Sequence, residues 1–298
     1  MIDTKRNKVY NIFVKICVNG YNKMAKYKIV CSDLDGTLLG LDMTVSEENR
    51  AAIRKMSELG VAFVASSGRT LHGFPRDVLE NADIRYLSAS NGAVIYDKKL
   101  GAPIYTKYIP KKISDQMFDI LWENNALIFP HIDGKMWGDM EKASHEIYAA
   151  HRMSSYFESY INAVGNFVND FKAFCKRASD VEMVSAFFPD DESLMRCTEA
   201  LRKAGDYTLA SSAKYNLEIF YAKAGKGNAL SEFARLMQID IKETIAVGDS
   251  TNDMSMIEAA GLGLAMGNAF AELKEAADEV ICSYDGHSAK YILEHYIL

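Results

Sequence analysis

Four aspartates in two short segments are the residues of this chain that could do chemistry together. Asp33 and Asp35 lie in DLDGT, and Asp249 and Asp253 lie in GDSTND. Each segment directly follows a short apolar run, YKIVCS or TIAV, which is the pattern of a buried strand. Because ligands of a parallel α/β sheet bind at the carboxyl ends of its strands, we expect the four carboxylates to converge at one edge of a sheet.

Further polar residues lie at two other places that are predicted to border the same edge of the sheet. Ser67, Gly68 and Arg69 follow the strand-like run VAFVA, and Lys226 begins the predicted helix before the second aspartate segment. Four carboxylates at one place cannot all be ionised unless a cation lies among them. An all-oxygen ligand set without His or Cys suits Mg²⁺. With the ammonium of Lys226 and the hydroxyl of Ser67, these residues predict a site that stabilises charge on a transferring phosphoryl group.

The elements predicted around these segments alternate as in an α/β fold. A strand over 27–32, a helix over 46–59 and a strand over 61–65 have tight connections, which indicates a right-handed βαβ unit. Ser46 is the predicted N-cap of that helix and Gly60 its C-terminal stop. The alternation returns late in the chain, over 226–238, 244–249, 253–260, 262–266, 269–277 and 279–282. Both ends of the chain therefore predict one Rossmann-like parallel sheet.

The middle of the chain breaks this alternation and predicts a second domain. The patterns indicate helices over 110–124, 142–160, 165–178 and 191–204, a hairpin over 126–138, and strands over 181–188 and 207–212. We therefore predict an α/β core over residues 24–106 and 214–298, an inserted α+β cap domain over 107–213, and an N-terminal extension over 1–23.

Length, composition and charge bound the class of protein. A chain of 298 residues with 49% apolar and 25% charged residues is typical of a globular protein of two domains. Its net charge of −6 disfavours nucleic acid as a partner, and no apolar run is long enough to span a membrane. The five cysteines form no CxxC pair, which favours reduced thiols and a cytoplasmic location.

The motifs and the placement of the insertion resemble a known enzyme superfamily. DLDGT, SGR, the lysine of GKG and GDSTND stand in the order of the four motifs of the haloacid dehalogenase-like (HAD) superfamily. The insertion looks like the C2 cap of the Cof-type phosphatases of subfamily IIB, and SNGA at 90–93 and MGNA at 266–269 are similar to that subfamily. The resemblance covers about residues 26–295 and implies a HAD-like phosphatase whose cap closes over the substrate.

The arrangement of carboxylates and the resemblance assign roles to the aspartates. Asp33 would attack phosphorus and form an aspartyl-phosphate, and Asp35 would protonate the leaving alcohol and then activate water. By the resemblance, Mg²⁺ would be bound by the carboxylate of Asp33, the main-chain oxygen of Asp35 and Asp249, with Ser250 and Asp253 close by.

The resemblance also implies which residues contact the substrate. The phosphate-binding set combines main-chain and side-chain groups of Leu34, Ser67, Gly68, Lys226 and Asn252. Arg69 and Asn91 are candidates for contact with substrate or cleft. Simpler interpretations stay open: a turn for DLDGT, a helix N-cap for Ser67, a solvated surface for Lys226 and structural pairing for Arg69.

The leading hypothesis is a Mg²⁺-dependent phosphatase that hydrolyses small phosphorylated metabolites, with sugar phosphates implied by the family. One alternative is phosphoryl transfer between sugar positions, as in related phosphomannomutases. Another is a non-catalytic metabolite-binding protein on the same scaffold, against which the intact acid at Asp35 speaks. In the predicted cap, His131, Asp133, Trp137 and Lys172 are candidates to face the cleft.

Overall fold

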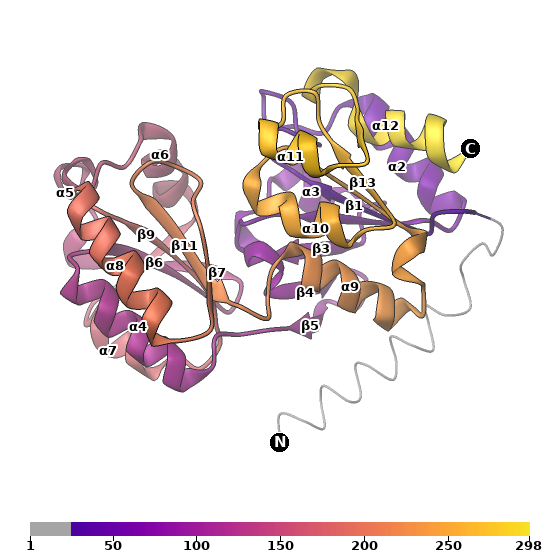
Figure 1. Ribbon diagram of the computed structural model, residues 1–298. Coiled ribbons are helices and arrows are strands. Elements are labelled where there is room, and N and C mark those ends of the chain that lie inside the picture. The colour runs from indigo at the N-terminus through magenta and orange to yellow at the C-terminus, as the bar shows by residue number, and fades with distance from the viewer. Residues whose placement is uncertain (1–24) are drawn as a thin grey trace. The chain divides into compact units, whose positions relative to one another are not determined.

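The computed structural model describes residues 25–298, and the extension predicted over 1–23 lies outside them (Figure 1). The described chain divides into two compact units. The first comprises the chain up to Gly68, Phe74–Thr106 and Lys226–Leu298. The second comprises Lys107–Gly225 and also the short segment Arg69–Gly73, so that the chain passes between the units four times.

A mixed sheet of eight strands forms the centre of the first unit. Its order is β14–β13–β12–β1–β2–β3–β4–β5. Neighbours from β14 to β3 are parallel, and the pairs β3–β4 and β4–β5 are antiparallel. The predicted parallel core is therefore present, with an antiparallel extension at one edge. The strands are β1 (Ile29–Asp33), β2 (Ala62–Ser66), β3 (Tyr86–Ala89), β4 (Val94–Asp97), β5 (Ala102–Thr106), β12 (Thr244–Gly248), β13 (Leu262–Ala265) and β14 (Glu279–Val280).

Helices pack on this sheet (Figure 1). The apolar side chains of its central strands are buried. The helices are α2 (Glu47–Glu58), α3 (Arg76–Glu80), α9 (Lys226–Met237), α10 (Met254–Ala259), α11 (Ala271–Ala276) and α12 (Ser288–Ile292). α9 packs against α10, and α2 packs against α12. The hydroxyl of Ser46 accepts a hydrogen bond from the N–H of Asn49, which confirms the predicted N-cap of α2. Gly60 follows α2 with φ +74°, the left-handed conformation expected of a C-terminal stop.

The second unit is an α+β layer structure around a sheet of six strands. The order is β10–β11–β9–β6–β7–β8, with only β7 and β8 parallel to each other. The strands are β6 (Leu127–Ile132), β7 (Lys135–Asp139), β8 (Gly165–Val168), β9 (Val181–Phe187), β10 (Tyr207–Ala210) and β11 (Asn216–Tyr221). The helices are α4 (Lys111–Glu123), α5 (His145–Ala150), α6 (Ser155–Val164), α7 (Phe171–Arg177) and α8 (Asp191–Ala204). Two separate apolar clusters form, one with α4, α7 and α8 and one with α5 and α6.

The structure differs from the predictions in two parts of this unit. The insertion extends to Gly225 rather than to residue 213, because β11 pairs with both β9 and β10. The helices predicted over 142–160 and 165–178 are replaced by α5, α6, β8 and α7. Ser154 caps a new helix at α6, and residues 165–168 pair with β7 instead of turning into a helix. Long-range pairing overrides the helical spacing there.

Two further findings concern the whole of the described chain. No helix among residues 25–298 combines the length and apolarity needed to cross a membrane. The four cysteines in this range are free thiols: Cys31, Cys175, Cys197 and Cys282. The cytoplasmic location stays a prediction.

Candidate active site

Three of the four predicted carboxylates meet at the carboxyl end of the central strands. β1 delivers Asp33, and the neighbouring parallel strand β12 ends at Gly248, directly before Asp249. One oxygen of each of Asp33, Asp249 and Asp253 lies within 4.8 Å of the others. Asp35 lies two residues beyond the strand and is half-buried. The aspartates, which are far apart in the sequence, form one acidic cluster because neighbouring parallel strands end at the same edge of the sheet.

Lys226, at the start of α9, is buried among these carboxylates. Its Nζ donates to Oδ1 of Asp33 at 2.6 Å and to Oδ1 of Asp253 at 2.5 Å. The residue is only 1% exposed, so the interpretation of Lys226 as a solvated surface lysine is wrong. A buried ammonium with two carboxylate partners compensates part of the negative charge of the cluster.

Asp253 is held by both of its carboxylate oxygens. Oδ1 accepts from Lys226, and Oδ2 accepts from the main-chain N–H groups of Asp249 and Ser250 at 3.1 and 3.0 Å. Because these bonds close the turn after β12, Asp253 orients that turn and the ammonium at the same time. Thr37, which the sequence interpretation did not single out although it lies within DLDGT, donates its hydroxyl to Oδ1 of Asp249 at 3.4 Å.

The crowding of carboxylates changes their protonation. Burial, with the charge of Asp253 next, raises the pKa of Asp33 well above its usual range. The same two causes raise the pKa of Asp249 to about 6. Burial acts against the charge of Lys226, but Asp253 and Asp33 outweigh it and raise the pKa of this lysine. The cluster is therefore short of positive charge, even with Lys226 in place.

The donor set of this cluster fits a hard divalent cation. Its donors are carboxylate oxygens only, as Mg²⁺ prefers, and they lie close enough to share one ion. Gly36 keeps the space beside them open, because a Cβ at this position would lie 2.4 Å from Oδ2 of Asp249. Its φ of +82° also disfavours any residue other than glycine. The residues present can thus hold a metal ion at Asp33 and Asp249.

The predicted phosphate-binding residues surround the same strand ends. Ser67 and Gly68 directly follow β2, and Ser67 is 2% exposed and donates its N–H to the oxygen of Ser88 at 2.8 Å. Ser67 caps no helix, so the N-cap interpretation is wrong. Leu34 follows Asp33 and is fully buried. Asn252 lies in the turn after β12 and is partly accessible.

Arg69 belongs to the second unit together with the rest of Arg69–Gly73. Its guanidinium donates to the hydroxyl of Tyr156 at 3.1 Å and to the oxygen of Gly73 at 3.2 Å, and it lies 5.0 Å from the ring centroid of Tyr160. These contacts favour the structural-pairing interpretation, and contact with substrate stays a prediction.

The residues predicted to face the cleft from the cap have different surroundings. His131 is 1% exposed, and burial lowers its pKa to about 3. Trp137 donates its indole N–H to the oxygen of Ile132 at 3.1 Å, and Asp133 forms the hairpin turn with φ +54°. Lys172 lines a cavity of about 410 Å³ inside the second unit. A role of these four residues at the cleft stays a prediction.

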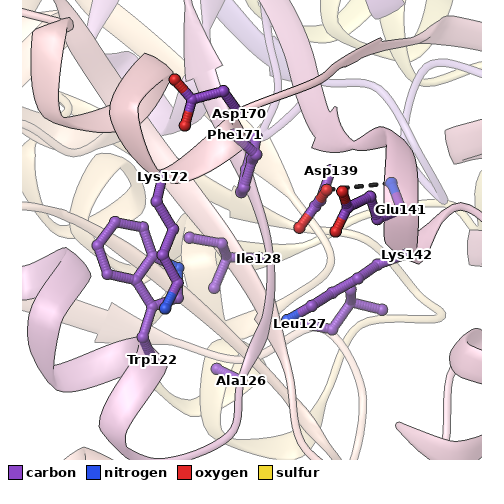
Figure 2. Close-up of a pocket in the computed structure, with 10 residues that line it drawn as sticks. All are labelled: Trp122, Ala126, Leu127, Ile128, Asp139, Glu141, Lys142, Asp170, Phe171 and Lys172. Atoms are coloured by element: carbon purple, nitrogen blue, oxygen red, sulfur yellow. Dashed lines mark hydrogen bonds between the residues drawn. The ribbon is translucent and has the colours of Figure 1, made fainter.

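Figure 2 shows the cavity that Lys172 lines. The ring of Trp122 forms one wall, and the ammonium of Lys172 lies 5.3 Å from its centroid. Asp139 and Glu141 lie on the opposite side, and Oδ1 of Asp139 accepts from the N–H of Glu141 at 3.1 Å (Figure 2). The cavity combines an aromatic wall with charges of both signs.

The fold and the site together define a phosphatase core of the α/β class that is interrupted by an α+β insert. A family model for haloacid dehalogenase-like hydrolases matches residues 30–293, and the chain belongs to this family. The prediction of a HAD-superfamily phosphatase of the Cof type is therefore confirmed.

Named relatives share nearly the full length of the chain. Phosphatase YwpJ of Bacillus subtilis (strain 168) is 32% identical over 286 residues, which cover 90% of this chain and 99% of YwpJ. The 5-amino-6-(5-phospho-D-ribitylamino)uracil phosphatase YcsE of the same strain is 29% identical, over 91% of this chain and 96% of YcsE. A solved haloacid dehalogenase-like hydrolase from B. subtilis is 30% identical, with a TM-score of 0.76 over 91% of this chain and 100% of that chain.

Proposed function

We propose that this phosphatase hydrolyses small phosphorylated metabolites with the help of Mg²⁺ and through an aspartyl-phosphate intermediate. The observation that carries the proposal is the convergence of Asp33, Asp249 and Asp253 around the buried ammonium of Lys226. With a divalent cation among these carboxylates, such a site would compensate the charge of a phosphoryl group while a carboxylate attacks it.

The residues divide the reaction into two steps. A carboxylate oxygen of Asp33 attacks phosphorus, the bond from phosphorus to the ester oxygen breaks, and Asp35 gives its proton to the departing alcohol. Asp35 then takes a proton from water, and the resulting hydroxide attacks the phosphorus of the acyl phosphate. Inorganic phosphate leaves and the carboxylate of Asp33 is regenerated.

The remaining residues bind and orient. Lys226 and the groups of Leu34, Ser67, Gly68 and Asn252 would bind the phosphate oxygens. Mg²⁺, held by Asp33, Asp249 and the main-chain oxygen of Asp35, with Ser250 and Asp253 close by, would supply electrostatic stabilisation of the transferring group.

The name of one relative supports a proposal for the substrate class. YcsE is named for a phosphorylated ribitylamino-uracil, which is a phosphomonoester of a sugar-like chain. We propose that this chain likewise hydrolyses the phosphomonoester of a sugar or a sugar-like metabolite. The insert, which lies between the second and third motifs, would determine which leaving groups the enzyme accepts.

Release of phosphate from p-nitrophenyl phosphate tests the proposal. Wild-type protein should turn over with Mg²⁺ and stop in EDTA, and Asp33→Asn should lose at least a thousandfold in kcat. Asp191→Asn, an exposed aspartate in the first turn of α8, is the matched control and should behave as wild type. Full turnover by Asp33→Asn would refute the mechanism. With a sugar phosphate as substrate, ³¹P NMR separates free phosphate from the isomerised ester that a mutase would form.

A further inference from the structure

Three consecutive residues beside the candidate site have left-handed backbone conformation. They are Ser90, Asn91 and Gly92, with φ of +51°, +51° and +84°, in the connection between β3 and β4. Two of them are not glycine, and such a conformation costs about 1–3 kcal/mol per residue unless the surroundings stabilise it. Ser90 is 0% and Asn91 is 1% exposed, so the strained turn is buried. Strain of this kind is concentrated at functional sites.

Asn91 joins two loops that the proposed function uses. Its main-chain N–H donates to the oxygen of Ser67 at 3.1 Å, in the loop after β2. Its Oδ1 accepts from Nδ2 of Asn252 at 3.3 Å, in the turn after β12. The same Oδ1 packs on Gly68, where a Cβ would lie only 3.1 Å away. With its backbone in the left-handed conformation, Asn91 contacts one loop through its main-chain N–H and the other through its side chain.

The hydrogen bonds continue from Asn252 to the nucleophile. Oδ1 of Asn252 accepts from the hydroxyl of Ser250 at 2.6 Å, and the N–H of Ser250 donates to Oδ2 of Asp253 at 3.0 Å. Oδ1 of Asp253 binds Lys226, which in turn binds Asp33. These two hydrogen bonds fix the orientation of the Asn252 side-chain amide, with its nitrogen toward Asn91 and its oxygen toward Ser250.

These contacts distinguish between two roles for Asn91. A residue that binds phosphate directly needs a donor aimed at it, whereas the atom of Asn91 that faces Gly68 and Asn252 is Oδ1, an acceptor. A residue that acts through others needs contacts with the groups that bind, and Asn91 contacts the loops of Ser67, Gly68 and Asn252.

We infer that Asn91 is a positioning residue of the phosphoryl site: its side chain holds the amide of Asn252, and its main-chain N–H holds the loop of Ser67, in the geometry that binds phosphate. This inference rests on the proposed function and deepens it. The main-chain bond to Ser67 and the side-chain bond from Asn252 help to hold the buried turn in its left-handed conformation. Asn91 thus contributes to catalysis without touching substrate.

The test uses Asn91→Gly, because glycine adopts the left-handed backbone without strain and removes only the side chain. We expect kcat/KM for p-nitrophenyl phosphate to fall about tenfold, the loss of one hydrogen bond. The dissociation constant of inorganic phosphate, measured by calorimetry with Mg²⁺, should rise by a similar factor. The melting temperature should stay within a few degrees of wild type. Asn125→Gly is the matched control, since Asn125 has φ +58° in the second unit, and its kcat/KM should stay at the wild-type value.

A double-mutant cycle with Asn252→Ala separates positioning from a general structural effect. If Asn91 acts through Asn252, the variant Asn91→Gly/Asn252→Ala should be no slower than Asn252→Ala alone. The inference would be overturned if the loss of kcat/KM in the double variant equalled the product of the two single losses. A wild-type kcat/KM for Asn91→Gly would overturn it as well. If wild-type protein releases no phosphate, the proposed function fails, and the phosphate dissociation constants still decide the role of Asn91: equal values for wild type and Asn91→Gly would refute it.

Discussion

Replacing Lys226 by methionine should destabilise the first unit more than any surface change of the same kind. Lys226→Met keeps an unbranched apolar chain as long as the methylene stem of the lysine and removes the ammonium that binds Asp33 and Asp253. The lysine side chain is 0% exposed, and those of the two aspartates are 8% and 0% exposed, so water cannot replace the lost partner. Removing one member of a buried ion pair costs about 3–5 kcal/mol. With two carboxylates left behind, we expect a loss of about 4–5 kcal/mol at pH 8 in EDTA.

The assay must report on the first unit alone. Both tryptophans of the chain, Trp122 and Trp137, lie in the second unit, so their fluorescence reports unfolding of that unit and not of the first. Hydrogen exchange measured by mass spectrometry over a series of urea concentrations gives the unfolding free energy of peptides from β1 and α9 separately. At pH 5 the loss should be smaller, because an aspartate that has lost its counter-ion can take up a proton.

Two control variants make the result interpretable. Lys55→Met removes a lysine whose side chain is 49% exposed and which pairs with Glu58 at 3.2 Å, and should cost at most about 0.5 kcal/mol. The double variant Lys226→Met/Asp33→Asn should be more stable than Lys226→Met at pH 8, since one uncompensated charge is removed. Stability of Lys226→Met within 1 kcal/mol of wild type, or a double variant less stable than it, would refute this account of the cluster.

Three further changes test other parts of the structure. The pKa of His131 is lowered to about 3, so the unfolded state binds the proton more tightly, and the second unit should lose about 2 kcal/mol between pH 7 and pH 5. Tryptophan fluorescence in urea should show this loss in wild type and not in His131→Leu. Gly227→Ala places a Cβ 2.1 Å from the oxygen of Ser255 and should cost about 1–3 kcal/mol, measured as a lower melting temperature; an unchanged value would contradict the close packing of α9 and α10. Ser46→Ala removes the N-cap of α2 and should cost about 1 kcal/mol by urea unfolding, whereas Ser46→Asp should retain most of it.

The sequence by itself determined the parts of this protein whose cause is local. Short apolar runs predicted the strands β1, β2 and β12, and the polar residues at their ends predicted the acidic cluster, because parallel strands present their carboxyl ends at one edge. The spacing of apolar residues and a capping serine predicted α2 with its correct first turn. The order of the motifs predicted the family.

Only the tertiary structure decided the parts that depend on distant partners. β8 and β11 become strands because they pair with β7 and β9, and no pattern within their own residues specifies those partners. The sequence predicted Lys226 for the phosphate-binding set, but only the fold shows that its ammonium is buried between Asp33 and Asp253. The role inferred for Asn91 likewise needs a backbone conformation and two loops brought together over long sequence separations, and local sequence encodes neither.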